Sequence, residues 1–228
     1  MVLSTDIPDC LDGVICLPWW KQNTSYMSRR TTAIAAALSV LALGSPLNVA
    51  RANPSFDQYV RQGVESYNSG NYRGALAAYT KAIEIDSQNA VLYSYRGDAK
   101  RNLQDFQGAI VDYTKAIEIN PQSDEAYLGR GVSKSRLKDY QGSISDYTKA
   151  IQINPQDAFA YYNRGLSKSK SKDLQGAIAD YTKAIEIDPK YAIAYIYRGI
   201  TKRKLGDYQA AIADYNKAIE INPEFSDA

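Results

Sequence analysis

The residues that most often carry nucleophilic, redox or metal chemistry stand only near the start of this sequence. Its two cysteines, Cys10 and Cys16, lie there, and the chain has no histidine. Two cysteines at this spacing, with no further cysteine or histidine nearby, do not predict a metal or redox site. From Ala52 onward there is no cysteine, histidine, tryptophan or methionine. We therefore predict a protein that is not an enzyme and that has no cofactor and no metal site.

A different chemistry is indicated by arginines and aspartates that recur together. Four copies of the pattern carry both residues, whereas the first copy has Gln62 and Ala78 at the two positions. Because the two residue types are gained and lost together, we predict a ladder of charge-assisted hydrogen bonds. The predicted pairs are Arg96 with Asp112, Arg130 with Asp146, Arg164 with Asp180, and Arg198 with Asp214.

A lysine follows each arginine by one helical turn. These lysines are Lys100, Lys134, Lys168 and Lys202. They could form a basic stripe for an acidic ligand. The interpretation that we favour is that each lysine either shares the aspartate or extends its charged end to solvent.

These residues are positioned by a repeat of 34 residues without insertions. The strings YTKAIEI, YTKAIQI and YNKAIEI begin at positions 79, 113, 147, 181 and 215, which is the mark of a repeat architecture. The units run over 56–89, 90–123, 124–157, 158–191 and 192–225, and 226–228 form a short tail.

Each unit has the pattern of two helices. In the fourth unit Ala177, Ile178, Tyr181 and Ala184 follow the spacing of an amphipathic helix, which ends before Pro189. Polar residues recur near each of these ends, and we interpret them as turn residues, not as catalytic acids. They are Asp86, Asn120, Asn154, Asp188 and Asn222.

This pattern resembles the tetratricopeptide repeat family over residues 56–225. The fourth unit shows its aromatic, glycine, alanine and proline positions at Tyr161, Gly165, Ala177, Tyr181 and Pro189. The resemblance implies an all-α fold: a right-handed α-solenoid of antiparallel helix pairs with a concave groove lined by the first helices. It also implies that the position of the four arginines, which is usually leucine, is mostly buried. An arginine there needs the aspartate as a partner, because an unpaired buried charge is costly.

Each first helix contains a glycine, which lowers helix propensity. We expect close contact with a small residue of the second helix to offset this. The glycines are Gly63, Gly97, Gly131, Gly165 and Gly199, and the small residues are Ala75, Ala109, Ser143, Ala177 and Ala211.

The register of the resemblance assigns the groove-facing positions. They are Val60, Val64, Tyr95, Asp98, Leu128, Val132, Tyr162, Asn163, Leu166, Ile196, Tyr197 and Ile200. Members of the family that bind chaperone tails use lysine and asparagine there, and this chain has mostly aliphatic residues. We predict a groove for a hydrophobic or extended peptide, with the tyrosines as anchors. The alternative is that these side chains pack one repeat against the next.

The C-terminal end is predicted to be a second contact surface. Solenoids normally end with a polar capping helix, and the last unit is followed by only three residues. Ile212, Tyr215 and Ile219 would then form an uncovered apolar strip, at which we expect self-association or partner docking.

The N-terminal region has the layout of a secretory signal peptide. A basic start at Met27 precedes an apolar run over 33–43 and a small-residue motif ending at Ala52. We assign 27–52 to the signal peptide, 53–55 to a short linker and 1–26 to an unassigned leader, with Met1 or Met27 as the start. The run is too short for a stable membrane span. Export to a periplasm, a thylakoid lumen or the medium is therefore expected.

The charge balance is nearly even, with 27 basic and 25 acidic residues. This does not favour nucleic acid as a partner. We predict an exported scaffold or adaptor that binds a protein or an extended peptide. The alternative is an assembly or regulatory subunit of an extracytoplasmic or thylakoid enzyme complex.

Overall fold

The computed structural model describes residues 54–227, which form ten α-helices and one 3-10 helix, without a strand in this range. The first helices of the five pairs are α2 (Pro54–Asn68), α4 (Ala90–Asn102), α6 (Asp124–Arg136), α8 (Ala158–Lys170) and α10 (Ala192–Lys204). The second helices are α3 (Tyr72–Ile85), α5 (Phe106–Ile119), α7 (Tyr140–Ile153), α9 (Leu174–Ile187) and α11 (Tyr208–Ile221), and η1 (Pro223–Asp227) follows. The predicted all-α solenoid of antiparallel helix pairs is confirmed.

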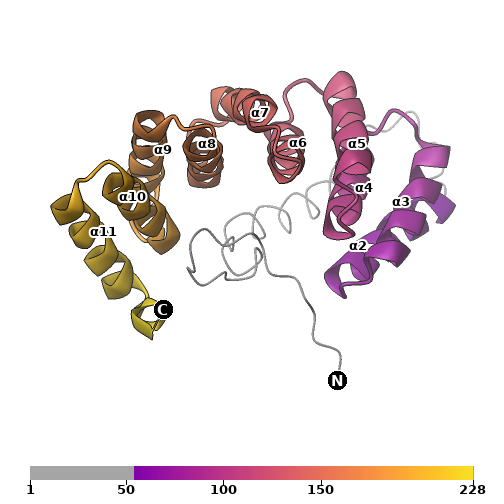
Figure 1. Cartoon of the computed structure of the whole chain (residues 1–228). Helices are drawn as coiled ribbons and strands as arrows, with labels where there is room; N and C mark the ends of the chain where they lie inside the picture. Colours follow the sequence, from indigo (N-terminus) through magenta and orange to yellow (C-terminus); the bar gives the residue numbers. More distant parts are fainter. Residues whose placement is uncertain (1–53, 228) are drawn as a thin grey trace, which may run out of the picture.

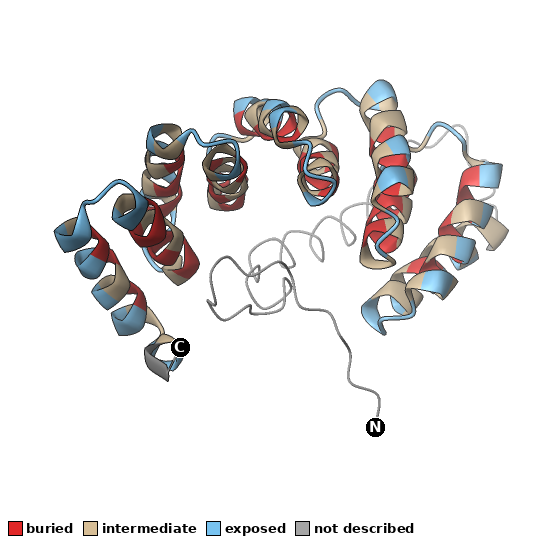
Figure 2. Cartoon of the chain, viewed as in Figure 1, coloured by how far each residue is buried: buried red, intermediate tan, exposed pale blue. Residues whose placement is uncertain are grey.

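The pairs stack side by side into an arch. Each first helix packs against the second helix of its own pair and, from α4 onward, against the second helix of the preceding pair. The first helices lie on the concave side of the arch and the second helices on its outer side (Figure 1). Buried residues concentrate where neighbouring helices face each other (Figure 2). Buried apolar residues form two clusters, one between residues 75 and 99 and one between residues 128 and 218, and each is built from neighbouring pairs as in other repeat proteins.

The start of each second helix is fixed by a capping residue, and in the first four units a glycine stands three positions later. The carboxylate of Asp139 accepts a hydrogen bond of 2.9 Å from the backbone amide of Gly142, which satisfies one free amide of the first turn. A Cβ atom on Gly142 would lie 2.1 Å from Asp139 Oδ2. In the last unit Ala210 takes the place of this glycine, and the bond to Asp207 lengthens to 3.2 Å.

The ends of the second helices are formed by the predicted turn residues. The side-chain oxygen of Asp188 accepts a hydrogen bond from the amide of Lys190 at 3.0 Å, and the same bond closes the other four turns. These short polar side chains mimic a backbone turn. Their interpretation as turn residues is confirmed.

The glycines of the first helices face tyrosines. A Cβ atom on Gly165 would lie 2.8 Å from Cε1 of Tyr181, and the other four glycines stand in the same relation to Tyr79, Tyr113, Tyr147 and Tyr215. The expected small residues are nearly fully buried, and the backbone oxygen of Ala211 would lie 3.2 Å from a Cβ atom on Gly199. The nearest atoms are those of the tyrosine ring, which the sequence did not indicate, and this ring leaves no room for a Cβ atom at the glycine.

Two predicted boundaries differ in the structure. Helix α2 begins at Pro54, so Pro54 and Ser55 belong to the first helix and not to a linker. Proline suits the first helical position because its fixed φ and missing N–H cost nothing there. Ser226 and Asp227, predicted as a tail, belong to η1. The leader over 1–26 and the signal peptide over 27–52 lie outside the described residues.

Within residues 54–227, no helix combines the length and the apolar character that a membrane crossing requires.

Candidate functional site

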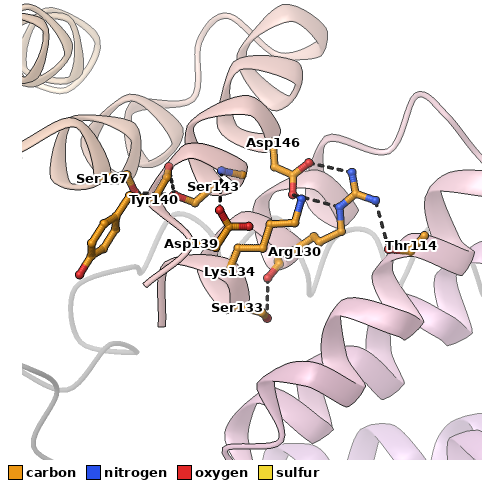
Figure 3. Close-up of polar contacts among 11 residues, drawn as sticks. Thr114, Arg130, Ser133, Lys134, Asp139, Tyr140, Ser143, Asp146 and Ser167 are labelled. Atoms are coloured by element: carbon orange, nitrogen blue, oxygen red, sulfur yellow. Dashed lines mark hydrogen bonds and ion pairs between the residues drawn. The ribbon is translucent and has the colours of Figure 1, made fainter. Parts of the chain in front are cut away.

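The recurring arginines join three helices. Arg130 of α6 donates from Nε to Asp146 Oδ2 at 3.0 Å and from Nη2 to Asp146 Oδ1 at 2.7 Å. Its Nη1 donates to the hydroxyl of Thr114 in the preceding pair at 3.1 Å (Figure 3), and its guanidinium lies 5.5 Å from the centre of the Tyr127 ring. One side chain therefore joins α6 to α7 by a bidentate contact and to α5 by the hydrogen bond to Thr114, while Tyr127 of its own helix supports the guanidinium by a cation–π contact.

The same geometry occurs in all four units that carry the pair. The Nη2 to Oδ1 distances are 2.6 to 2.7 Å for Arg96 with Asp112, Arg164 with Asp180 and Arg198 with Asp214 as well. The structure thus brings together every arginine and aspartate that the sequence paired. The threonine and tyrosine contacts were missed, although Thr80, Thr114, Thr148 and Thr182 recur with the same interval.

The recurring lysines share the aspartates. Lys134 Nζ lies 2.8 Å from Asp146 Oδ2, and Lys100, Lys168 and Lys202 make the same contact at 2.8 to 2.9 Å. Each of these four buried aspartates therefore contacts an arginine and a lysine. These lysines share the aspartates of the ladder, as we favoured, and do not form a stripe for a ligand.

Six of the twelve predicted groove residues are buried. Tyr95, Asp98, Leu128, Tyr162, Ile196 and Ile200 are each at most 8% exposed. The register placed them correctly on the first helices, but neighbouring repeats approach closely enough to cover them. As ligand-contacting residues these six are therefore a wrong prediction, and their position is that of packing residues between repeats.

The other six predicted groove residues are partly exposed. Val60 and Val64 lie on α2, and Val132, Asn163, Leu166 and Tyr197 lie on α6, α8 and α10. The amide of Asn163 donates to the carbonyl of Phe159 at 2.8 Å, within its own helix. The valines, Leu166 and Tyr197 pack at the margins of the two cores. Of the twelve predicted groove residues, only these six have access to solvent.

Tyrosines gather beneath this surface between α8 and α10. The ring of Tyr162 lies 5.3 Å from Tyr191, 5.7 Å from Tyr197 and 6.1 Å from Tyr181, measured between centroids. Burial raises the pKa values of Tyr162, Tyr181 and Tyr191 well above the ordinary value. The hydroxyls of Tyr181 and Tyr191 are buried without a hydrogen-bond partner among the described residues, so these rings act as packing groups.

A buried polar network lies between α4 and α5. Arg101 Nη2 lies 3.0 Å from Asp98 Oδ1, and Tyr113 donates to the same oxygen at 2.7 Å. The sequence assigned Asp98 to the groove, whereas its side chain is only 1% exposed. Nothing in the repeat pattern indicated the pair, because Arg101 has no counterpart with an acidic partner in the other units.

The last second helix exposes the predicted apolar strip. Ile212 is 51% exposed and Ile219 is 37% exposed, whereas Ile185, which corresponds to Ile219 in α9, is 9% exposed. Tyr215 is partly covered. The sequence missed Tyr208, which is 62% exposed. The difference arises because a following first helix covers α9 but not α11.

Residues 54–227 contain no cluster of three potential metal-ligating side chains. Cys10 and Cys16 lie outside the described residues. The described part is a stack of helix pairs with one concave surface and one uncovered end. These features define a helical-repeat interaction protein.

Comparison with known proteins gives the family. The sequence matches models described as tetratricopeptide repeat at 59–89, 158–191 and 192–225, and as TPR repeat at 97–137 and 135–172. The chain therefore belongs to the tetratricopeptide repeat family. The comparison with curated proteins gives no match.

Solved structures of the same fold include two MamA structures and YrrB. A crystal structure of MamA is 26% identical, with a TM-score of 0.68 over 76% of this chain and 94% of that one. MamA 41-end from Desulfovibrio magneticus RS-1 is 21% identical, with a TM-score of 0.70 over 75% and 96%. YrrB, described as a TPR protein with an unusual peptide-binding site, is 23% identical, with a TM-score of 0.62 over 72% and 85%.

Proposed function

We propose that this chain is an exported, non-catalytic scaffold that binds an extended segment of another protein along the concave side of its arch. The observation that carries the proposal is the set of partly exposed side chains on three consecutive first helices, Val132, Asn163, Leu166 and Tyr197. They offer apolar and hydrogen-bonding contacts on a rigid framework, which is what groove recognition of a peptide requires. The same fold carries a peptide-binding site in YrrB.

The site is tested by capture from an extracytoplasmic extract with matched variants. Val132→Ala with Leu166→Ala removes apolar contact on the concave side, and Val111→Ala removes it on the outer side, where Val111 is 61% exposed. A partner bound by the wild type and by V111A but lost by V132A/L166A supports the site. A partner that V132A/L166A retains contradicts it.

Export rests on the layout of residues 27–52 and has its own test. Mass spectrometry of the protein isolated from its natural source should show a chain that begins at Asn53. An intact chain recovered from the cytoplasm would contradict export, and the binding proposal would be unaffected.

The uncovered face of α11 is proposed as a contact between two copies of this chain. Ile212 and Ile219 are two helical turns apart and therefore lie on one face. An antiparallel pairing of two α11 helices places Ile212 of one copy opposite Ile219 of the other, which is the self-complementarity of a two-fold dimer. The opposite end of the arch is polar, because Gln58, Arg61 and Glu65 of α2 are exposed, and head-to-tail stacking is therefore disfavoured.

Sedimentation equilibrium tests this contact. We expect a dimer that Ile212→Ser with Ile219→Ser converts to a monomer, while Val111→Ser leaves it intact. A wild-type protein that remains monomeric at 100 μM, a concentration on the order of a weak dimer's Kd, would contradict it.

A further inference from the structure

The last residue of each first helix is uncharged in the first two repeats and basic in the next three. Helices α2 and α4 end with Asn68 and Asn102, whereas α6, α8 and α10 end with Arg136, Lys170 and Lys204. These three cations occupy the same position in consecutive repeats, and all three are exposed. Lys138, Lys172 and Arg203, also exposed, stand beside them. We call these six residues the basic band.

The lysines two residues earlier on the same helices make ionic contacts that these cations do not make. Each of those lysines lies within 2.9 Å of a buried aspartate. Arg136, Lys170 and Lys204 form no ion pair with any residue of the described range. The acidic groups of the adjoining turns are the capping residues Asp139, Asp173 and Asp207, and the cations of the band outnumber them. The band therefore keeps an excess of positive charge.

The band borders the concave surface. Arg136 stands four residues after Val132 on α6, and Lys170 stands four residues after Leu166 on α8. Residues four apart are neighbours on one helix face, so each cation lies one turn beyond a partly exposed groove residue. Neighbouring helices pack at about 8–10 Å, so the three cations repeat at intervals on the order of 10 Å. A peptide in the polyproline II conformation has three residues per turn and rises about 3.1 Å per residue, so every third residue faces the same side, about 9 Å further on, and can meet one cation.

We propose that the partner of the concave surface is an acidic extended segment, with carboxylates at about every third residue against Arg136, Lys170 and Lys204. This inference rests on the proposed function and specifies the chemistry of the ligand. The apolar residues between the carboxylates lie against Val132, Leu166 and Tyr197.

The favourable interaction of cations with helix C-termini does not account for the band. Helices α2 and α4 end with asparagine at the same position and are as regular as the others. The fold therefore does not require a cation there.

The test uses the synthetic peptide EVSEVSEVSE and its neutral counterpart QVSQVSQVSQ, measured by fluorescence anisotropy on the full-length protein. We expect the acidic peptide to bind at least about tenfold more tightly in 0.05 M salt, as three exposed ion pairs allow. The difference should shrink in 0.5 M salt because exposed charges are then screened.

Two matched triple variants separate the band from net charge. Arg136→Gln, Lys170→Gln and Lys204→Gln together should abolish the preference, whereas Arg73→Gln, Lys149→Gln and Lys190→Gln, which remove the same charge from other exposed sites, should keep it. Circular dichroism controls for folding. Equal binding of both peptides would overturn this inference and leave the proposed function standing. Equal loss in both variants would also overturn it. If V132A/L166A abolishes binding of both peptides, the proposed function is supported independently.

Discussion

The ladder of arginine and aspartate pairs is tested most sharply by substituting Arg130. Its two bonds to Asp146 are 3.0 and 2.7 Å long, and the side chain of Asp146 is only 4% exposed. Removing one partner of a buried ion pair costs about 3–5 kcal/mol, because the remaining charge is left in a poorly solvated position. Lys134 still lies 2.8 Å from the carboxylate, so we expect Arg130→Gln to cost about 3 kcal/mol.

The reverse deletion should cost less. Asp146→Ala leaves Arg130 and Lys134, whose side chains are 16% and 22% exposed and can turn toward water, so about 2 kcal/mol is expected. The double variant recreates the Gln62 and Ala78 of the first unit, which folds as the same helix pair without the ion pair.

Urea unfolding followed by circular dichroism measures the double-mutant cycle. The double variant should cost about 2–3 kcal/mol, less than the sum of the single variants, with a coupling of about 2 kcal/mol. Exposed Lys149→Gln, the control, should stay within about 0.5 kcal/mol of the wild type. Costs that add to within about 0.5 kcal/mol would refute the ladder as a coupled unit.

Three further predictions concern stability. Gly165→Ala should cost about 1–3 kcal/mol in urea unfolding, because its Cβ would lie 2.8 Å from the Tyr181 ring; an unchanged midpoint would contradict the close contact. Lys138→Gly should stabilise by about 1 kcal/mol, since Lys138 has a φ of 64°, a conformation that glycine adopts without strain; a lower midpoint would contradict this. Burial raises the pKa of Tyr162 and Tyr191, so these residues contribute their full stability below about pH 10, where the unfolded chain begins to ionise. The urea midpoint should therefore fall as pH rises from 9 to 11.5, and a flat profile would contradict the buried tyrosine cluster.

The ladder of arginine and aspartate pairs could be predicted from sequence because the pairs recur in four units. The arginine and aspartate of each pair are absent together in the first unit, and a shared loss of two opposite charges points to contact. The turn residues could be predicted because their chemistry is local. A single interaction such as Asp98 with Arg101 could not, since it occurs once and the repeat gives no second example.

Whether a groove residue is buried depends on how closely neighbouring repeats approach each other, and the sequence register does not give that distance. Sequence position places Tyr162 and Leu166 on the same helix face, but Tyr162 lies under the rings of α9 and α10, whereas Leu166 keeps access to solvent. Likewise, small residues seemed the natural neighbours of the glycines. Only the structure shows that a tyrosine ring occupies that space.

Hydrogen exchange with the peptide EVSEVSEVSE bound shows whether the ligand lies on the concave side of the arch. Amide exchange in secondary structure slows where a ligand suppresses local opening. We expect slower exchange in the C-terminal turns of α6, α8 and α10, with α5, α7 and α9 unchanged at their outer faces. Protection confined to α11 or to the second helices would contradict it.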